Sequence, residues 1–116
     1  MPRKEDVVRL QHMLEASRDA VSFTQNKNRG SLDADKMLCL SIVRCIEIIG
    51  EAASRLSPEC QTEFPQIPWK NIINMRNRLI HAYYDINLNT VWSTITEDLP
   101  PLIAELEKIL QSAKKP

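Results

Sequence analysis

Several features that would place a protein in a common class are scarce in this sequence. Only two glycines occur among 116 residues, and β-branched residues do not alternate with polar ones, so a β-sheet protein is not expected. The chain has no run of 18 apolar residues, and we therefore expect no membrane-spanning helix. The first ten residues, MPRKEDVVRL, lack the apolar stretch of a signal peptide, which predicts a cytoplasmic protein.

Net charge and a cysteine framework are also missing. Lys and Arg together number 15, as do Asp and Glu, so any attraction for phosphate must come from a local patch. Three cysteines at irregular spacing argue against a disulfide framework, and none pairs with a histidine at a zinc-ligand spacing. Cys39 and Cys45 lie in an apolar helical run and are predicted to be small core residues. We expect neither a metal site nor a cofactor.

The apolar residues follow a helical period almost everywhere, which predicts an all-α protein. A first helix is expected over about residues 3 to 25, and a second begins after a cap at Ser31 or Asp33. The segment SPECQTEFPQIP, residues 57 to 68, is predicted to be a loop because its three prolines interrupt helices. A third helix is expected over about 68 to 83, and a fourth starts at Asn87 or Asn89.

Two details refine this arrangement. Pro100 and Pro101 should kink or split the fourth helix near its middle. The second helix is apolar on more than one face, as is typical of a central helix or of one that packs against a second chain. Its main stripe is Leu38, Ile42, Cys45, Ile49, Ala52 and Leu56, and Met37, Leu40, Val43, Ile46 and Ile48 lie on its other faces. We therefore predict one domain, residues 1–116, folded as an up-down bundle of four to five helices and forming a homodimer.

The third helix separates polar from apolar residues on a helical wheel. Ile72, Met75, Leu79 and Ala82 form the stripe expected to face the core, and the opposite stripe is Lys70, Asn74, Asn77 and His81. Arg76 and Arg78 flank the polar stripe. No Asp or Glu occurs from residue 64 to 84, which makes this helix a candidate phosphate-binding surface. The alternative is an ordinary solvated helix face.

The segment RNRLIHAY, Arg76 to Tyr83, resembles the Arg-x4-His-x-Tyr signature of HepT-type toxins, a branch of the HEPN superfamily of helical ribonucleases. The similarity extends to IEIIGEAASRLSPE and to FPQIPWKNIINMRNRLIHAYYDINLNTVWSTITEDLPPLI, so it covers nearly the whole chain in order. The resemblance implies a metal-independent endoribonuclease whose site forms across a homodimer, with Arg76 and His81 as catalytic residues. The 2′-OH of the RNA attacks the adjacent phosphate, giving a 2′,3′-cyclic phosphate and a 5′-OH.

The resemblance also implies a partner and a means of control. Members of this family form type VII toxin–antitoxin systems, in which a minimal nucleotidyltransferase antitoxin attaches AMP to the motif tyrosine, here Tyr83. The RNA substrate could be transfer RNA or messenger RNA. A non-catalytic helical dimer that binds a nucleotidyltransferase or a nucleotide is the alternative, and a purely structural dimer is a third possibility.

The residue types suit this chemistry. Histidine titrates near neutrality and can act as base or acid, and a guanidinium can stabilise the charge that develops on the attacked phosphate. On an ideal helix Arg76 and His81 are about 140° apart. A long arginine side chain, a loosened last helical turn or assembly from two subunits could bring them together. Asn77, Arg78 and Lys70 are candidate substrate-binding residues.

Five further side chains receive simpler interpretations. Glu47 and Glu51 could pair with Arg76 or Arg44, or they could form a solvated edge of the second helix. Trp69 and Trp92 are predicted to be core anchors because of their apolar spacing. His12 lies among polar neighbours and is predicted to be a surface residue.

Overall fold

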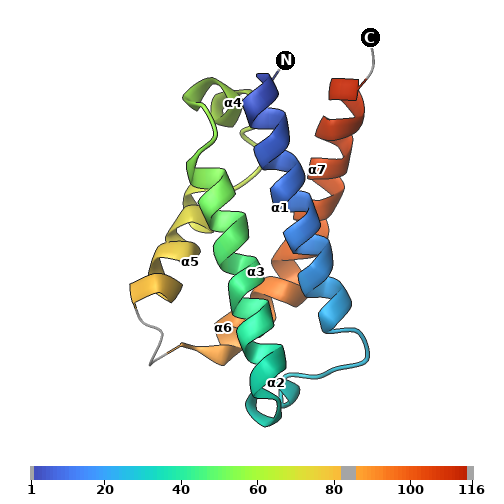
Figure 1. Cartoon of the computed structure of the whole chain (residues 1–116), viewed down its shortest axis with the longest axis vertical. Coiled ribbons are helices and arrows are strands. Elements are labelled where there is room, and N and C mark those ends of the chain that lie inside the picture. Colours follow the sequence, from blue (N-terminus) through green and yellow to red (C-terminus); the bar gives the residue numbers. More distant parts are fainter. Residues whose placement is uncertain (1, 82–85, 115–116) are drawn as a thin grey trace.

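Four long helices form the body of the protein. The computed structural model describes residues 2–81 and 86–114, without the side chains of residues 80, 81 and 114. The long helices are α1 (Lys4–Phe23), α3 (Lys36–Ser54), α5 (Trp69–His81) and α7 (Leu99–Lys114). Shorter ones are α2 (Ser31–Ala34), α4 (Pro58–Glu63), α6 (Leu88–Ser93) and the π-helical turn η1 (Thr94–Asp98). No strand occurs in the described residues, and the long helices run alternately down and up (Figure 1), which confirms the predicted all-α up-down bundle.

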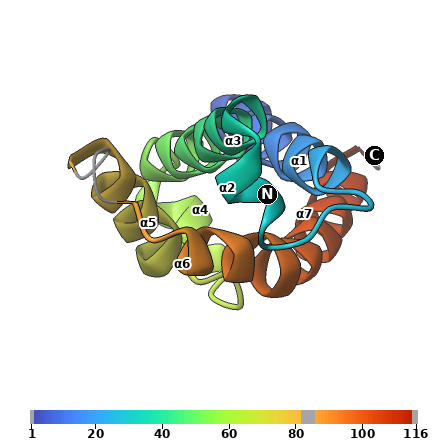
Figure 2. The same cartoon turned by 90° about the horizontal axis from the view of Figure 1, so that it is seen from below.

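Helix α3 is central. It packs against α1 on one side and α5 on the other, and α1 also packs against α7, so the long helices follow one another around the core (Figure 2). The main stripe predicted for this helix is buried throughout: Leu38, Ile42, Cys45, Ile49, Ala52 and Leu56. Val43 and Ile46 are buried as well, whereas Met37 and Leu40 are exposed. The central position thus accounts for most, but not all, of its apolar faces.

The start of α3 is fixed by Asp35. Its carboxylate accepts a hydrogen bond from the backbone N–H of Leu38 at 3.1 Å, which satisfies a donor at the helix end. The predicted cap at Ser31 or Asp33 was therefore wrong. Both residues belong to the separate short helix α2, which ends before Asp35.

The segment predicted to be a loop contains helix α4, so that prediction was wrong over Pro58–Glu63. Proline has no backbone N–H, but the N–H groups of the first helical turn have no partner within the helix. Pro58 can therefore begin a helix. The Ser57 hydroxyl oxygen accepts a hydrogen bond from the Cys60 N–H at 3.2 Å and caps it. Asp6 of α1, itself buried, accepts hydrogen bonds from the Ser57 N–H at 2.9 Å and the Ser57 hydroxyl at 2.6 Å. This pair ties α4 to α1.

Trp69 anchors the beginning of α5. Its side chain is buried, and its indole N–H donates to the carbonyl oxygens of Gln61 at 3.0 Å and Phe64 at 2.9 Å. The ring thus fills the core while its polar atom is satisfied. The prediction of a core anchor is confirmed, and Trp92 packs half-buried against the same core.

The fourth predicted helix is split, as its prolines required. It consists of α6, the π-helical turn and α7, with Pro100 and Pro101 in the first turn of α7. The N–H of Leu99 donates to the carbonyl of Thr94, five residues earlier, so the change of helix type directly precedes the prolines. Among the described helices, none is both long and apolar enough to cross a lipid bilayer.

Candidate active site on helix α5

Helix α5 crosses α3 at Gly50, where the two backbones come very close. A Cβ atom at position 50 would lie 2.1 Å from the Cβ and 2.8 Å from the Cγ of Arg76. Only glycine, which has no side chain, is compatible with this approach. As a result the stem of Arg76 lies directly over α3.

The guanidinium of Arg76 is held by two neighbours. It is half-buried, and it donates one hydrogen bond to Glu51 of α3 and another to the side-chain oxygen of Asn77 at 3.0 Å. The second carboxylate oxygen of Glu51 accepts a hydrogen bond from Nε of Arg55 at 2.7 Å. The Arg55 hydrogen bond and the charges of Arg76 and Arg55 outweigh desolvation and lower the pKa of the Glu51 carboxyl. Glu51 is therefore a charged anchor for Arg76.

The rest of α5 divides as the helical wheel predicted. Lys70, Asn74 and Asn77 are exposed, whereas Ile72 and Met75 are half-buried and Leu79 is buried. His81 is the last residue of α5, and its side chain is not described. The predictions for Ala82 and for Tyr83 lie outside the described residues.

Arg78 lies on a different side of α5 from Arg76. It lines a cleft of about 390 Å³ whose walls come from α3, α5, η1 and α7. Three acids line the same cleft: Glu97, Asp98 and Glu105. The structure therefore brings Arg76, Asn77 and Glu51 together, whereas Arg78 lines a cleft that also has acidic side chains in its walls.

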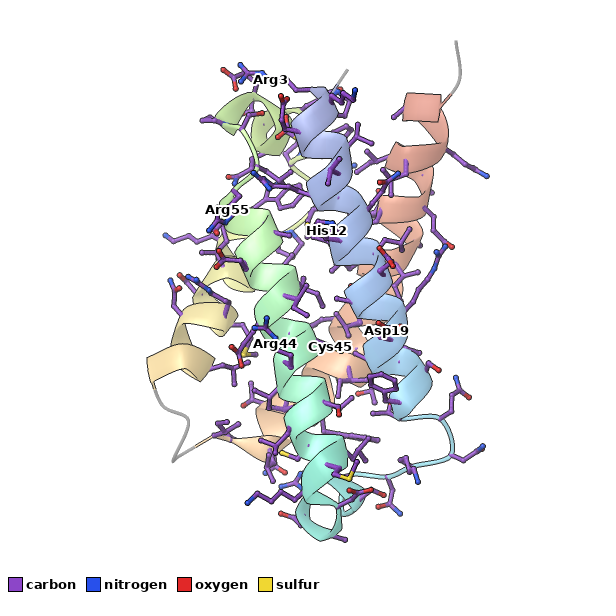
Figure 3. All side chains as sticks on the ribbon, in the orientation of Figure 1. Arg3, His12, Asp19, Arg44, Cys45 and Arg55 are labelled. Atoms are coloured by element: carbon purple, nitrogen blue, oxygen red, sulfur yellow. The ribbon has the colours of Figure 1, made fainter. Side chains whose placement is uncertain are left out.

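Of the two interpretations of the second-helix glutamates, pairing with arginines is confirmed, and so is the surface position of His12. Glu51 pairs with Arg76, and Glu47 pairs with Arg44, with 3.8 Å between Arg44 Nη1 and the Glu47 carboxylate. His12 is exposed on α1, at its boundary with α3 (Figure 3). The role of Gly50 was missed, although an isolated glycine within an apolar helical run is a recognisable sign of close backbone approach.

The cysteines are structural in character. Cys45 and Cys60 are buried and Cys39 is partly buried, and all three are free thiols. Burial, with the negative charges of Asp6 and Glu63, raises the pKa of the Cys60 thiol to about 11, which keeps it protonated and unreactive. In the part of the chain that the structure describes, no three His, Cys, Asp or Glu side chains come together as metal ligands.

The chemical capacity of this arrangement lies in the fixed guanidinium. Glu51 and Asn77 orient Arg76 before any ligand arrives, so little reorganisation is needed when an anion binds. A guanidinium also matches the geometry of two phosphate oxygens. The site is suited to binding a phosphate at the exposed side of α5.

Comparisons with known proteins identify the family and relatives of this chain. A family model described as "Ribonuclease HepT-like" matches residues 13–109. A Methanocaldococcus jannaschii protein named "Putative RNase" is 33% identical over 111 residues, covering 96% of this chain and 92% of that protein. A Caldanaerobacter subterraneus protein with the same kind of name is 33% identical over 105 residues, covering 90% and 94%. A Thermococcus cleftensis protein named "Probable ribonuclease HepT" is 37% identical over 75 residues, covering 65% and 68%.

No solved structure gives a significant match to the chain. The family match spans most of the chain, including α3, the described part of α5, and the contact between Gly50 and Arg76. The protein belongs to the HepT-like ribonuclease family.

Proposed function

We propose that this protein is the toxin of a type VII toxin–antitoxin system and acts in the cytoplasm as a metal-independent endoribonuclease. The observation that carries the proposal is the fixed guanidinium of Arg76, which stands five residues before His81 on one helix of a HepT-like ribonuclease. Arg76 and His81 are the proposed catalytic residues. The substrate is RNA, either transfer RNA or messenger RNA.

The proposed reaction needs two proton transfers. One histidine removes the proton from the ribose 2′-OH, whose oxygen forms a bond to the adjacent phosphorus. The bond from phosphorus to the 5′-oxygen breaks, and a second histidine donates a proton to that oxygen. The products are a 2′,3′-cyclic phosphate and a 5′-OH. Arg76 stabilises the negative charge that grows on the phosphate oxygens.

A homodimer supplies the second histidine, because the motif of one chain contains only His81. Support for a dimer comes from α3, where Met37 is 80% exposed and Leu40 is 59% exposed. Large apolar side chains on the surface of a central helix are suited to contact a second copy. We propose that the two copies meet through these residues at the start of α3 and so bring the two α5 helices together.

The remaining polar residues of α5 have supporting roles in the proposal. Asn77 accepts a hydrogen bond from Arg76 and is itself exposed, so it can orient both the guanidinium and the substrate phosphate. Lys70 and Arg78 are exposed cations on the same helix and are proposed to contact neighbouring phosphates of the RNA.

The toxin must be held inactive until it is needed. We propose that a minimal nucleotidyltransferase antitoxin transfers AMP from ATP to the hydroxyl of Tyr83 and releases pyrophosphate. The attached phosphate adds negative charge two residues after His81, where it repels the RNA and competes for Arg76. Tyr83→Phe should keep the nuclease activity and escape this silencing, as intact-mass measurement of the co-expressed pair would show.

The experiment that tests the proposal is RNA cleavage in excess EDTA. The purified protein should cleave RNA and leave cyclic phosphate ends. Arg76→Ala and His81→Ala should each abolish cleavage while the helical circular dichroism is retained. Activity that is lost on chelation and restored by magnesium would contradict the mechanism. Binding of nucleotidyltransferase or nucleotide without any cleavage would favour the alternative, a non-catalytic helical dimer.

A further inference from the structure

A second basic surface lies outside α5, in the groove between α1 and α3. The groove has a volume of about 350 Å³ and is lined by Arg9, His12, Arg44, Ile48, Glu51, Ala52 and Arg55. In Figure 3, His12 lies on α1, Arg44 lies on α3 and Arg55 lies at the end of α3. Three arginines against one glutamate give this groove an excess of two positive charges.

Two other hollows of the described surface differ from it in charge. The cleft between α5 and α7 has one arginine and three acids. The groove between α1 and α7 has two cations, Arg18 and Lys108, and two acids, Glu15 and Glu107. In a chain whose formal net charge is zero, the α1–α3 groove is thus the basic one of the three.

The arginines of the groove are arranged so that they can still meet an anion. Arg9 donates from Nε to the backbone carbonyl of Arg55 at 3.3 Å, and Arg55 donates from Nε to Glu51 at 2.7 Å. These contacts use the Nε atoms of Arg9 and Arg55 and hold the two side chains in place. The terminal guanidinium nitrogens of both residues are the atoms that can bind a phosphate. Arg44 is 70% exposed, and its pair with Glu47 is long, at 3.8 Å.

The groove is physically joined to the proposed active site through Glu51. One oxygen of this carboxylate binds Arg55 inside the groove, and the other binds Arg76 of α5. A phosphate in the groove and a phosphate at Arg76 would therefore lie on two sides of one side chain. Because a single strand of RNA carries one phosphate per nucleotide, a strand bound at Arg76 presents further phosphates to the neighbouring groove.

We propose that the α1–α3 groove binds the phosphate backbone of single-stranded RNA next to the cleaved bond, an inference that rests on the proposed function. Arg9, Arg44 and Arg55 meet the phosphates, and His12 offers a further hydrogen-bonding group. Asp19 lies further along α1 and places a negative charge beyond the groove (Figure 3). The contacts are to phosphate, so they hold the strand without reading its sequence.

The test uses a fluorescent 2′-O-methyl RNA, which has no free 2′-OH and cannot be cleaved by the proposed reaction. Its affinity is measured by anisotropy over a series of salt concentrations, for the full chain and for Arg9→Gln/Arg44→Gln. Arg55 is left unchanged because it also contacts Glu51. The matched control is Arg3→Gln/Arg18→Gln, which removes two arginines that are 65% and 53% exposed and pair with Glu59 and Glu107.

For single strands, each phosphate contact contributes about 0.7 to the slope of the logarithm of the binding constant against the logarithm of the salt concentration. At 0.1 M salt this corresponds to roughly five-fold in affinity for each contact. The groove variant lacks two such contacts, so we expect its affinity to fall roughly 25-fold and the slope of its salt dependence to fall by about 1.4. The control should change by less than about two-fold, as expected for charges remote from the strand. Equal losses in both variants, or no loss in the groove variant, would overturn the proposal.

Two further outcomes are distinguishable. If the groove variant binds RNA normally but loses its dimeric mass in light scattering, the groove is an interface between copies and the proposal is wrong. If wild-type protein binds the 2′-O-methyl RNA through the groove yet cleaves no unmodified RNA, the groove is supported and the proposed nuclease function fails.

Discussion

Glu51 accepts hydrogen bonds from two arginines at once, and this makes it a positioning residue for Arg76. Glu51→Gln removes the charge that holds both guanidinium groups. We expect kcat for RNA cleavage to fall by ten-fold or more, since small misplacements of a catalytic group can cost about 100-fold. KM should not rise, because the substitution also removes the single acid that lines the α1–α3 groove. The unfolding midpoint should change little, because ion pairs exposed to solvent contribute weakly to stability.

Glu47→Gln is the matched control for this prediction. Glu47 lies one turn before Glu51 on α3 and pairs with Arg44 instead of Arg76. Its loss should leave kcat within about two-fold of the wild type, as expected for an exposed pair of small energetic effect. A similar fall of kcat in both variants would assign the effect to surface charge and not to the position of Arg76.

Gly50 provides a stability prediction at the same scale. Alanine favours a helix over glycine by about 1 kcal/mol, but its Cβ would overlap the stem of Arg76. We expect the steric overlap to outweigh the higher helix propensity of alanine. Gly50→Ala should therefore destabilise the protein by about 1–3 kcal/mol in urea unfolding. Ser41→Ala, at an exposed position of the same helix, should stay within about 0.5 kcal/mol. A stabilised Gly50→Ala would mean that α5 shifts away from α3 without cost.

At the scale of single residues, the sequence predicted which faces of α5 are buried, and it offered pairing with an arginine as one of two interpretations of the α3 glutamates. Helical periodicity carries this information, because it orders residues around one axis. It says nothing of how two helices cross. The contact of Arg76 with Gly50, and the shared contact of Glu51 with Arg55, follow from that crossing and could not be derived from either helix alone.

Among the elements, α4 depends most clearly on a single buried interaction. Asp6 of α1 accepts both hydrogen bonds of Ser57, the residue that caps α4. Asp6→Ala should lower the free energy of unfolding at neutral pH by about 1.5–3 kcal/mol, the usual range for hydrogen bonds to a charged group. Urea unfolding followed by circular dichroism would measure it. Glu5→Ala, at an exposed position of the same helix, is the matched control.

The same pair predicts the direction of the pH dependence. Burial raises the pKa of Asp6, but the hydrogen bonds from Ser57 and the contacts with Arg3 together lower the pKa by more than burial raises it. The folded pKa therefore lies below the ordinary value of 3.8. The stabilisation is therefore complete above pH 3.8 and is lost as the pH falls through the lower folded pKa. The stability difference between wild type and Asp6→Ala should shrink only in this acid range. A difference that stays constant through it would show that the charge of Asp6 is not involved.

The element boundaries show where sequence reasoning was weakest. The long helices were predicted because their apolar stripes extend over many turns, and the split at Pro100 and Pro101 followed from their missing N–H groups. Helix α4 was missed because proline was treated as a helix breaker, although Pro58 occupies the first turn, where it is tolerated. The cap of α3 was misplaced by a few residues because Ser31, Asp33 and Asp35 are all chemically suitable.

For the whole molecule, assembly is the property to test first. We expect a dimer at micromolar concentration, twice the 13.3 kDa of one chain, by light scattering. Leu40→Glu should convert it to a monomer and abolish RNA cleavage, because a charge would be buried in the contact and each site would lose its second histidine. Phe23→Glu, which changes another exposed apolar residue, is the control. A wild-type monomer that cleaves RNA would contradict the shared site. That residues 1–116 act as one domain stays a prediction.

The direction of the helices has a practical consequence for attaching the protein to something else. The start of α1 and the end of α7 lie at the same end of the bundle, near α4, while the last turn of α5 points toward the other end (Figure 1). A flexible tether at either position would therefore extend away from His81. Protein immobilised on beads through such a tether should cleave RNA at a rate close to that of the free protein, so the same preparation can be washed and assayed repeatedly with different RNA strands.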